Sequence, residues 1–348
     1  MVGVRDFRWS FIVFGVGLVL AFFWGQQTAM GGLTALWIAL VLAILEISLS
    51  FDNAVVNAGV LKHMDAFWRQ MFLTVGILIA VFGMRLVFPI VIVAFASDIG
   101  VGETITMALQ RPDEYSAVLL GSYPSIAAFG GMFLLLVFLN FIFDPDRGIH
   151  WLGAVERRLA SFGKLDNISV LVSLCVLFGM QWWLPQALQL TVLVAGLAGV
   201  MLYIGVDVLA SMFGGDDGGD EMATAAKRSG VGGFMYLEVL DASFSFDGVI
   251  GAFAITRDVV IIMIGLAIGA MFVRSMTVYL VNKGTLDEYV FLEHGAHYAI
   301  GVLAVIMLVG IQHHVPEVIT GLLGVAFIVA ALISSIRYRK RNSAAAGA

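Results

Sequence analysis

The sequence is poor in charge and in cysteine. Of its 348 residues, 13% are charged and 60% are hydrophobic, whereas a soluble domain carries about 25% charged residues. The single cysteine, Cys175, cannot form an internal disulfide and leaves the redox compartment undetermined. The net charge is -6 and no basic stripe is present, so nucleic acid is excluded as an expected partner. The low charge and high hydrophobicity indicate an integral membrane protein.

Long apolar runs fill most of the chain. Because a transmembrane helix needs about 20 apolar residues, each run of that kind is a candidate crossing. Ten candidates result, and they leave no room for a soluble domain. They cover residues 8–24, 32–60, 67–97, 124–143, 167–184, 187–212, 233–256, 258–281, 294–311 and 316–336. We therefore expect an all-α polytopic membrane protein.

Basic residues indicate how these helices are oriented. Loops on the cytoplasmic side of a membrane carry an excess of Lys and Arg. With the N-terminus inside, 15 of the 19 basic residues fall in cytoplasmic segments, and the outside loops hold Arg111 and Arg257. We expect a multi-pass protein of the cell (inner) membrane with both termini in the cytoplasm.

Two segments of the sequence repeat each other. "LEISLSFDNAV" at 45–55 aligns with "LDASFSFDGVI" at 240–250, and "GILIAVFGMR" at 76–85 aligns with "GLAIGAMFVR" at 265–274. The alignment divides the chain into an N-terminal helix (1–31), a first repeat half (32–143), a connecting part (144–232) and a second repeat half with a basic tail (233–348). The connecting part contains a cytosolic loop, two helices and an acidic linker.

The copies begin five crossings apart, so they must run through the bilayer in opposite directions. Inverted repeats of this kind in secondary transporters place the substrate at the midplane, on interrupted helices. Ser, Asp and Asn compete with backbone hydrogen bonds and are concentrated in both copies. We expect helices two and seven to be interrupted there.

The repeated segments carry acids that are costly in a membrane. Each carboxylate at a helix centre costs about 2.5 to 3.5 kcal/mol on insertion scales. Arg85 and Arg274 are the expected charge partners, but two cations cannot neutralise five acids. An oxygen-rich site suits Mn²⁺, Mg²⁺ or Ca²⁺. The expected metal ligands are Asp52, Asn53, Asp241, Asp247, Glu46 and Glu238, supported by Ser48, Ser50, Ser243 and Ser245.

The paired motifs "EISLSFDN" and "EVLDASFSFD" resemble the TerC family of integral membrane proteins, in the LysE-type transporter superfamily. The resemblance covers about 33–97 and 234–336. It implies an inverted-repeat export fold, links to Mn²⁺ efflux and tellurium resistance, and an acidic motif at the six expected ligands. Gly248 departs from the serine often found there, and loops 98–123 and 144–166 are longer than the family pattern.

The leading functional hypothesis is an exporter of divalent cations. We expect Mn²⁺ first, with Ca²⁺ or Mg²⁺ as alternatives, moved by alternating access and exchanged for protons. No prosthetic group and no enzymatic activity are expected. The main alternative is a membrane scaffold that recruits cytosolic stress-response proteins through residues 144–166 and 213–232. An amino-acid exporter and an intramembrane aspartyl hydrolase are further alternatives, and a homo-oligomer is compatible with each.

Overall fold

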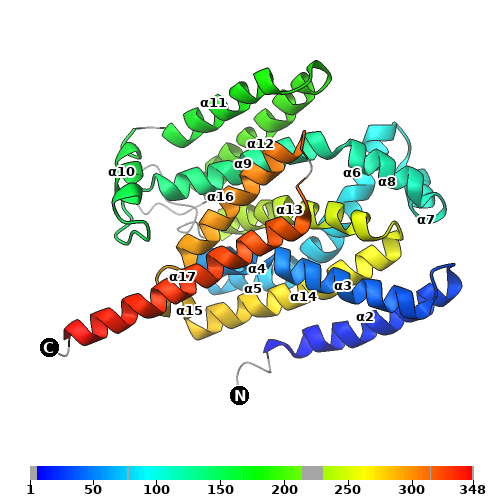
Figure 1. Ribbon diagram of the computed structural model, residues 1–348, viewed down its shortest axis with the longest axis horizontal. Coiled ribbons are helices and arrows are strands. Elements are labelled where there is room, and N and C mark those ends of the chain that lie inside the picture. Colours follow the sequence, from blue (N-terminus) through cyan, green and yellow to red (C-terminus); the bar gives the residue numbers. More distant parts are fainter. Residues whose placement is uncertain (1–5, 77, 166, 214–229, 314, 347–348) are drawn as a thin grey trace.

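Helices account for the regular structure in the part of the chain that the computed structural model describes, residues 6–76, 78–165, 167–213, 230–313 and 315–346 (Figure 1). The first half contains α2 (Arg8–Gln27), α3 (Gly32–Leu49), α4 (Phe51–Leu61), α5 (Ala66–Met71), η1 (Phe72–Gly76), η2 (Ile79–Val87), α6 (Phe88–Ser97), α7 (Val101–Gln110), α8 (Pro112–Gly121) and α9 (Tyr123–Ile142). The second half contains α10 (Ala154–Phe162), α11 (Ile168–Trp183), α12 (Gln186–Phe213), α13 (Gly230–Ile255), α14 (Val259–Lys283), α15 (Thr285–Glu288), α16 (Leu292–Gly310) and α17 (Glu317–Ala346).

The predicted crossings all form helices. By length and composition, eight stretches of the described chain could cross a membrane: Arg8–Gln27, Gly32–Leu49, Ala66–Ser97, Tyr123–Ile142, Gln186–Leu209, Val259–Lys283, Leu292–Gly310 and Ile319–Arg341. The other two predicted crossings correspond to α11, which has 16 residues, and to α13, whose 26 residues include the acids of the second repeat. This is the architecture of a polytopic membrane protein.

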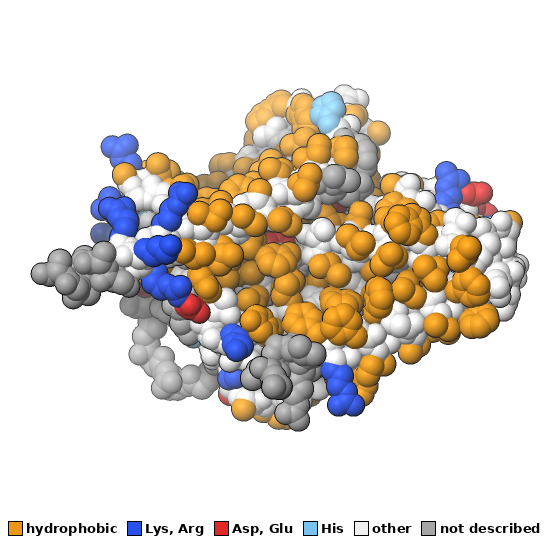
Figure 2. Space-filling view, turned by 60° about the horizontal axis from the view of Figure 1, so that its bottom comes forward, with side chains coloured by type: hydrophobic (Ala, Val, Ile, Leu, Met, Phe, Trp, Pro, Cys, Tyr) orange, Lys and Arg blue, Asp and Glu red, His pale blue; other side chains and the backbone are white. Residues whose placement is uncertain are grey.

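The outer surface is apolar over a broad area. Figure 2 shows a hydrophobic face, with Lys and Arg side chains gathered mainly toward one end of the molecule. Large apolar side chains are exposed on the outer helices, among them Phe11 and Leu20 on α2, Phe178 and Trp182 on α11, and Leu190 and Met201 on α12. Contiguous apolar surface of this extent is what a lipid bilayer would cover.

The second predicted crossing, residues 32–60, is interrupted, as predicted. α3 ends at Leu49, α4 begins at Phe51, and Ser50 between them has φ -103° and ψ 16°, which is outside the helical range. The hydroxyl of Ser50 donates to the Glu46 carboxylate at 2.9 Å. The carbonyl of Ser50 accepts from the backbone amide of Ala54 and so begins the hydrogen-bond ladder of α4.

The prediction that helix seven is interrupted was wrong. α13 runs without a break from Gly230 to Ile255. The Ser243 hydroxyl donates to the backbone carbonyl of Val239, one turn earlier, at 2.9 Å. Bonding of this kind within a helix usually causes a slight destabilisation or bend and not a break.

The third predicted crossing, residues 67–97, is partly π-helical, which was not expected. Two of its segments, η1 and η2, are π-helical, and π-helical turns inside membrane helices are often found at functional sites. The long external loop predicted at 98–123 contains α7 and α8, and the loop at 144–166 contains α10. The acidic linker lies mostly outside the described residues.

The ends of α14 follow from its sequence. The Asp258 carboxylate accepts hydrogen bonds from the backbone amides of Val260 and Ile261, which caps the first turn. Gly284 ends the helix with φ 61°, a conformation that a residue with a side chain rarely adopts. Asp258 also accepts from the Trp24 indole at 3.0 Å, which ties α14 to the end of α2.

The two repeats pack against each other crosswise. Helix α3 of the first repeat lies on α14 of the second, and η2 lies on α13. Likewise α16 packs on α4, α9 packs on α13, and α9 and α16 pack together. In Figure 1, α3 and α4 run in the opposite direction to α13. This reciprocal pairing agrees with the inverted repeat inferred from the sequence.

Candidate functional site

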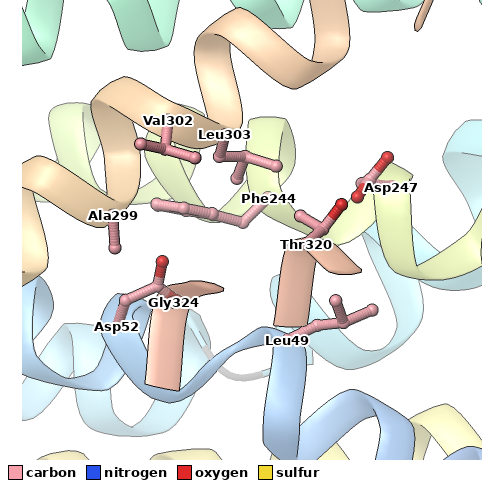
Figure 3. Close-up of a pocket in the computed structure, with 9 residues that line it drawn as sticks. All are labelled: Leu49, Asp52, Phe244, Asp247, Ala299, Val302, Leu303, Thr320 and Gly324. Atoms are coloured by element: carbon pink, nitrogen blue, oxygen red, sulfur yellow. The ribbon is translucent and has the colours of Figure 1, made fainter. Parts of the chain in front are cut away.

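A small buried cavity lies between the acidic helices of the two repeats. It has a volume of about 10 Å³ and is lined by Asp52 of α4, Asp247 of α13 and Thr320 of α17, with an apolar wall that includes Phe244 and Leu303. In Figure 3, Asp52 and Asp247 lie toward opposite ends of this space, with Gly324 and Thr320 between them. We name it the Asp52–Asp247 cavity. Its two acids occupy equivalent positions in the repeat.

The interruption of helix two positions Asp52. Because the chain restarts as α4 at Phe51, Asp52 lies in the first turn of a new helix. The positive end of a helix dipole stabilises a carboxylate there, and the backbone amide of Asn53 donates to Asp52 Oδ1 at 2.9 Å. Asp52 is 4% exposed. The break therefore supplies electrostatic support for a charge inside the bundle.

Helix α17 contributes residues that sequence reasoning missed. A Cβ atom built on Gly324 would lie 3.6 Å from Asp52 Oδ2, so the carboxylate rests against the backbone of α17. Thr320 adds a hydroxyl to the cavity wall and is 9% exposed. The available signal was a lone threonine followed by glycines within an apolar helix, which is weak because such residues also serve packing.

A second cavity lies on the other side of α4. It has a volume of about 40 Å³ and is lined by Asn53, Asn57, Asp241 and the two repeat-equivalent arginines, among others. The Asn57 amide donates to Asp241 Oδ1 at 2.9 Å. The side-chain carbonyl oxygens of Asn53 and Asn57 are buried and accept no hydrogen bond in the described structure. We name it the Asp241 cavity.

The arginines of the Asp241 cavity have different partners. Arg85 forms a buried ion pair with Glu46 and also donates to the backbone carbonyl of Ala80. Arg274 donates twice to the backbone carbonyl of Leu73, at 2.7 and 3.1 Å. Among the described residues Arg274 therefore has a backbone partner in η1 and no acid, which differs from its expected pairing.

Glu46 lies against the second repeat. A Cβ atom built on Gly269 would lie 2.5 Å from Glu46 Cβ, and one on Gly248 would lie 2.9 Å from Glu46 Oε2. Gly269 is therefore required for the close approach of α3 to α14, whereas a side chain at position 248 would meet only the end of the Glu46 side chain.

Glu238 is buried without compensation. It is 6% exposed, and neither carboxylate oxygen has a hydrogen-bond partner among the described residues. Its Oε1 lies where the Cβ of any larger residue at position 76 would be, so Gly76 of η1 makes room for it. A buried carboxylate without a partner is very costly as an anion.

The four serines have separate roles in the structure. Ser50 lines the Asp241 cavity and bonds Glu46, and Ser243 bonds its own helix. Ser245 is buried, and its hydroxyl has no partner in the described chain. Ser48 is exposed and lines neither cavity, because its helix face points away from both. That Ser48 supports a metal site stays a prediction.

The structure thus divides the predicted ligands into groups. Asp52 and Asp247 line one cavity, Asn53 and Asp241 line the other, and Glu46 and Glu238 lie at helix contacts outside both linings. Within the described residues, no three side chains of His, Cys, Asp or Glu are grouped closely enough to hold a metal ion. That all six residues bind one ion remains a prediction.

Charge distinguishes the two cavities. In the Asp241 cavity, Arg85 and Arg274 balance Asp241 and the neighbouring Glu46. Among the described residues, the Asp52–Asp247 cavity is lined by two acids and by no basic side chain. The described linings of the two cavities therefore differ in net charge.

The fold and these cavities define a polytopic α-helical membrane protein with a duplicated acidic core. A family model described as "Protein of unknown function (DUF475)" matches residues 51–342. The chain belongs to this family. Neither the comparison with curated proteins nor that with solved structures yields a match.

Proposed function

We propose that this protein exports divalent metal cations, with Mn²⁺ as the first candidate and Ca²⁺ or Mg²⁺ as alternatives. The observation that carries the proposal is the Asp52–Asp247 cavity, where repeat-equivalent acids meet a threonine hydroxyl without a basic residue in the lining. Carboxylate and hydroxyl oxygens are the ligands that hard divalent cations prefer. The resemblance to the TerC family supports the same substrate.

The cost of burying the charge of Asp52 supports a cation beside it. A carboxylate at the centre of a membrane helix costs about 2.5 to 3.5 kcal/mol on insertion scales. The described structure gives Glu46 an ion pair with Arg85, but no basic side chain is recorded beside Asp52. A divalent ion in the cavity would compensate the buried carboxylate of Asp52.

The size of the cavity supports a transport role. A volume of about 10 Å³ holds roughly one water-sized particle, so an ion there would have lost most of its hydration. Asp52 and Asp247 lie toward opposite ends of the space with α17 between them (Figure 3). Drawing both acids onto one ion requires α4, α13 and α17 to shift, which is the kind of rearrangement that alternating access needs.

Protons are the proposed coupling ion, and Glu238 is the proposed carrier. Its carboxyl group is buried without a partner, so it is tolerated best in the neutral, protonated form. Glu46, by contrast, pairs with Arg85 and has a structural role. Entry of a metal ion would release the proton from Glu238 by electrostatic repulsion.

Metal export by charge-neutralised variants tests the proposal. Asp52→Asn and Asp247→Asn, expressed at parental levels, should lose the ability to lower cellular Mn²⁺, with export reduced about tenfold or more, because each removes half of the negative charge of the site. Asp207→Asn is the matched control, since Asp207 lies on α12 and lines neither cavity. Export by both site variants at the parental rate would refute the proposal.

A scaffold function predicts the opposite pattern. Shortening the 144–166 loop would then abolish function, and the intramembrane variants would be silent. The 144–166 loop is packed against the helix bundle and is not a free docking segment. Glu156 of α10 is 1% exposed and accepts a hydrogen bond from Tyr298 of α16 at 2.7 Å. A loop anchored in this way belongs to the body of the bundle.

A further inference from the structure

A third and larger cavity lies where α9 ends and α16 begins. Its volume is about 260 Å³, and its polar lining consists of Asn140, Asp144, Arg147, Glu293, His294 and His297. The charge pattern of the loops places this end of the bundle on the cytoplasmic side. We name it the α9–α16 vestibule.

The wall of the vestibule is held in place by a buried carboxylate. Glu156 accepts hydrogen bonds from the backbone amides of Trp151 and Leu152, at 2.8 and 3.2 Å, and from the Tyr298 hydroxyl. These bonds fix the loop after α9 against α16. The cavity is therefore a built feature of the fold.

Arg147 is held by stacking. Its guanidinium lies 3.6 Å from the centre of the Phe141 ring, and the His297 ring stacks on Phe141 at 3.8 Å with an angle of 8° between the planes. Burial lowers the pKa of Arg147, while Asp144, Glu156 and Glu293 act in the opposite direction. The positive charge of Arg147 therefore faces the aromatic ring of Phe141.

The histidines present hydrogen-bond acceptors. His297 Nδ1 lies 2.8 Å from the backbone carbonyl of Glu293, and His294 Nε2 lies 3.0 Å from that of Ile149. A carbonyl oxygen can only accept, so each of these nitrogens carries the hydrogen, and in the neutral ring the other nitrogen carries a lone pair. His294 is 4% exposed, and its Nδ1 has no partner in the described structure.

The vestibule therefore combines negative charge with acceptors. Asp144 and Glu293 contribute two carboxylates against the one charge of Arg147, and the buried Glu156 adds a third carboxylate nearby. Such a site attracts cations and accepts hydrogen bonds. The described side chains of the vestibule do not bring three such ligands together, and a wide cavity of this kind suits contact through the water shell of an ion.

Size supports a ligand that keeps its water. A water molecule takes up about 30 Å³ of liquid, so an ion with six waters needs roughly 180 Å³. The vestibule is large enough for such a complex, whereas the Asp52–Asp247 cavity, at about 10 Å³, is not. Mg²⁺ in particular loses its waters reluctantly and is often bound through them.

We propose that the α9–α16 vestibule is a separate loading site that binds a divalent cation with its water shell intact. Asp144, Glu293 and the lone-pair nitrogen of His297 accept hydrogen bonds from that shell. The site raises the local concentration of cations before one loses its water in the Asp52–Asp247 cavity. Its role in loading rests on the proposed export function.

Hexaamminecobalt(III) is the probe for this site, because it mimics a hydrated metal ion and does not release its ligands. Calorimetric titration of the purified full-length protein should show binding. Asp144→Asn and Glu293→Gln should each weaken it about tenfold, since each removes one charge beside the cation. Asp146→Asn is the matched control, because Asp146 is exposed and does not line the cavity. Absence of binding, or equal binding by all variants, would overturn the proposal.

A second comparison separates this inference from the export function. The Asp52→Asn and Asp247→Asn variants should bind the complex as the parent does, because the probe cannot enter the small cavity. If these variants retain export while hexaamminecobalt binding follows Asp144 and Glu293, the export site is wrong and the vestibule stands. If they lose export while hexaamminecobalt fails to bind, the vestibule is wrong and the export site stands.

Discussion

At the scale of single residues, neighbouring side chains of α4 serve different cavities. Asp52 lines the Asp52–Asp247 cavity and Asn53 lines the Asp241 cavity, because consecutive residues of a helix point about 100° apart. The sequence predicted which polar residues would be buried between the repeats. It could not predict which of the two cavities each residue would line, since that depends on how each helix is rotated against its neighbours.

Residues outside the repeated motif were also beyond prediction. Asn57 and Thr320 enter the two cavities from positions that the repeat alignment does not mark. Both are ordinary polar residues in apolar helices, and their role depends on the contact of α4 and α17 with α13. Sequence periodicity within one helix holds no information on such contacts.

The pair formed by Glu46 and Arg85 provides a test of stability. Glu46→Gln should lower the apparent free energy of unfolding by about 3 to 5 kcal/mol, because it leaves the Arg85 charge buried without a partner. The double variant Glu46→Gln with Arg85→Met should recover much of that loss, since no unpaired charge remains. Thermal unfolding in detergent measures both. Equal stability of parent and Glu46→Gln would contradict the pairing.

Glu238 provides a test of proton coupling. Glu238→Gln keeps the size of a protonated carboxyl group and should leave folding unchanged. Because the amide cannot release a proton, metal export by this variant should no longer respond to a proton gradient. Transport into vesicles with and without a pH difference measures the effect. A variant that responds to the gradient like the parent would rule out Glu238 as the carrier.

At the scale of helices, the interruption in helix two was predictable and its absence in helix seven was not. Both copies concentrate Ser and Asp, but Ser50 donates to the Glu46 carboxylate, whereas its repeat equivalent Ser245 has no hydrogen-bond partner in the described structure. The choice follows from what lies beside each serine in the folded bundle. The π-helical form of η1 and η2 likewise has no distinct sequence signal.

Gly76 provides a test of the contact between η1 and α13. Gly76→Ala would place a methyl group against the Glu238 carboxylate, and we expect a loss of about 1 to 3 kcal/mol of stability through overpacking. Gly83→Ala is the matched control in η2, because its Cβ would meet Ile79 at an ordinary 3.4 Å. The control should be neutral or stabilising by up to about 1 kcal/mol. Thermal unfolding that shows the reverse order would contradict the described contact.

At the scale of the whole molecule, the sequence predicted the helical membrane architecture, and the crosswise packing agrees with the predicted repeat. Apolar runs identify bilayer crossings because a membrane requires continuous apolar helix. The repeat alignment pairs Asp52 with Asp247 and Arg85 with Arg274, and each pair shares one cavity. The size of the vestibule has no sequence signal, because the cavity forms from a loop and two helix ends.

The lone cysteine tests the bilayer placement. Cys175 is exposed on α11, and we expect that it faces lipid. A charged, membrane-impermeant maleimide should therefore label it slowly in intact membranes, since the reactive thiolate forms only in water. Gln110→Cys in a Cys175→Ser background is the control, because Gln110 is exposed at the end of α7, in the loop that the sequence predicts to be external. Equally fast labelling of both positions would contradict a lipid-facing α11.

The most direct test of the central claim is anomalous X-ray scattering from crystals of the full-length protein soaked in Mn²⁺. We predict a peak between Asp52 and Asp247, beside Thr320, that is lost in the Asp52→Asn variant. An Asp52–Asp247 cavity without a peak, in crystals where Mn²⁺ is bound elsewhere, would contradict the account.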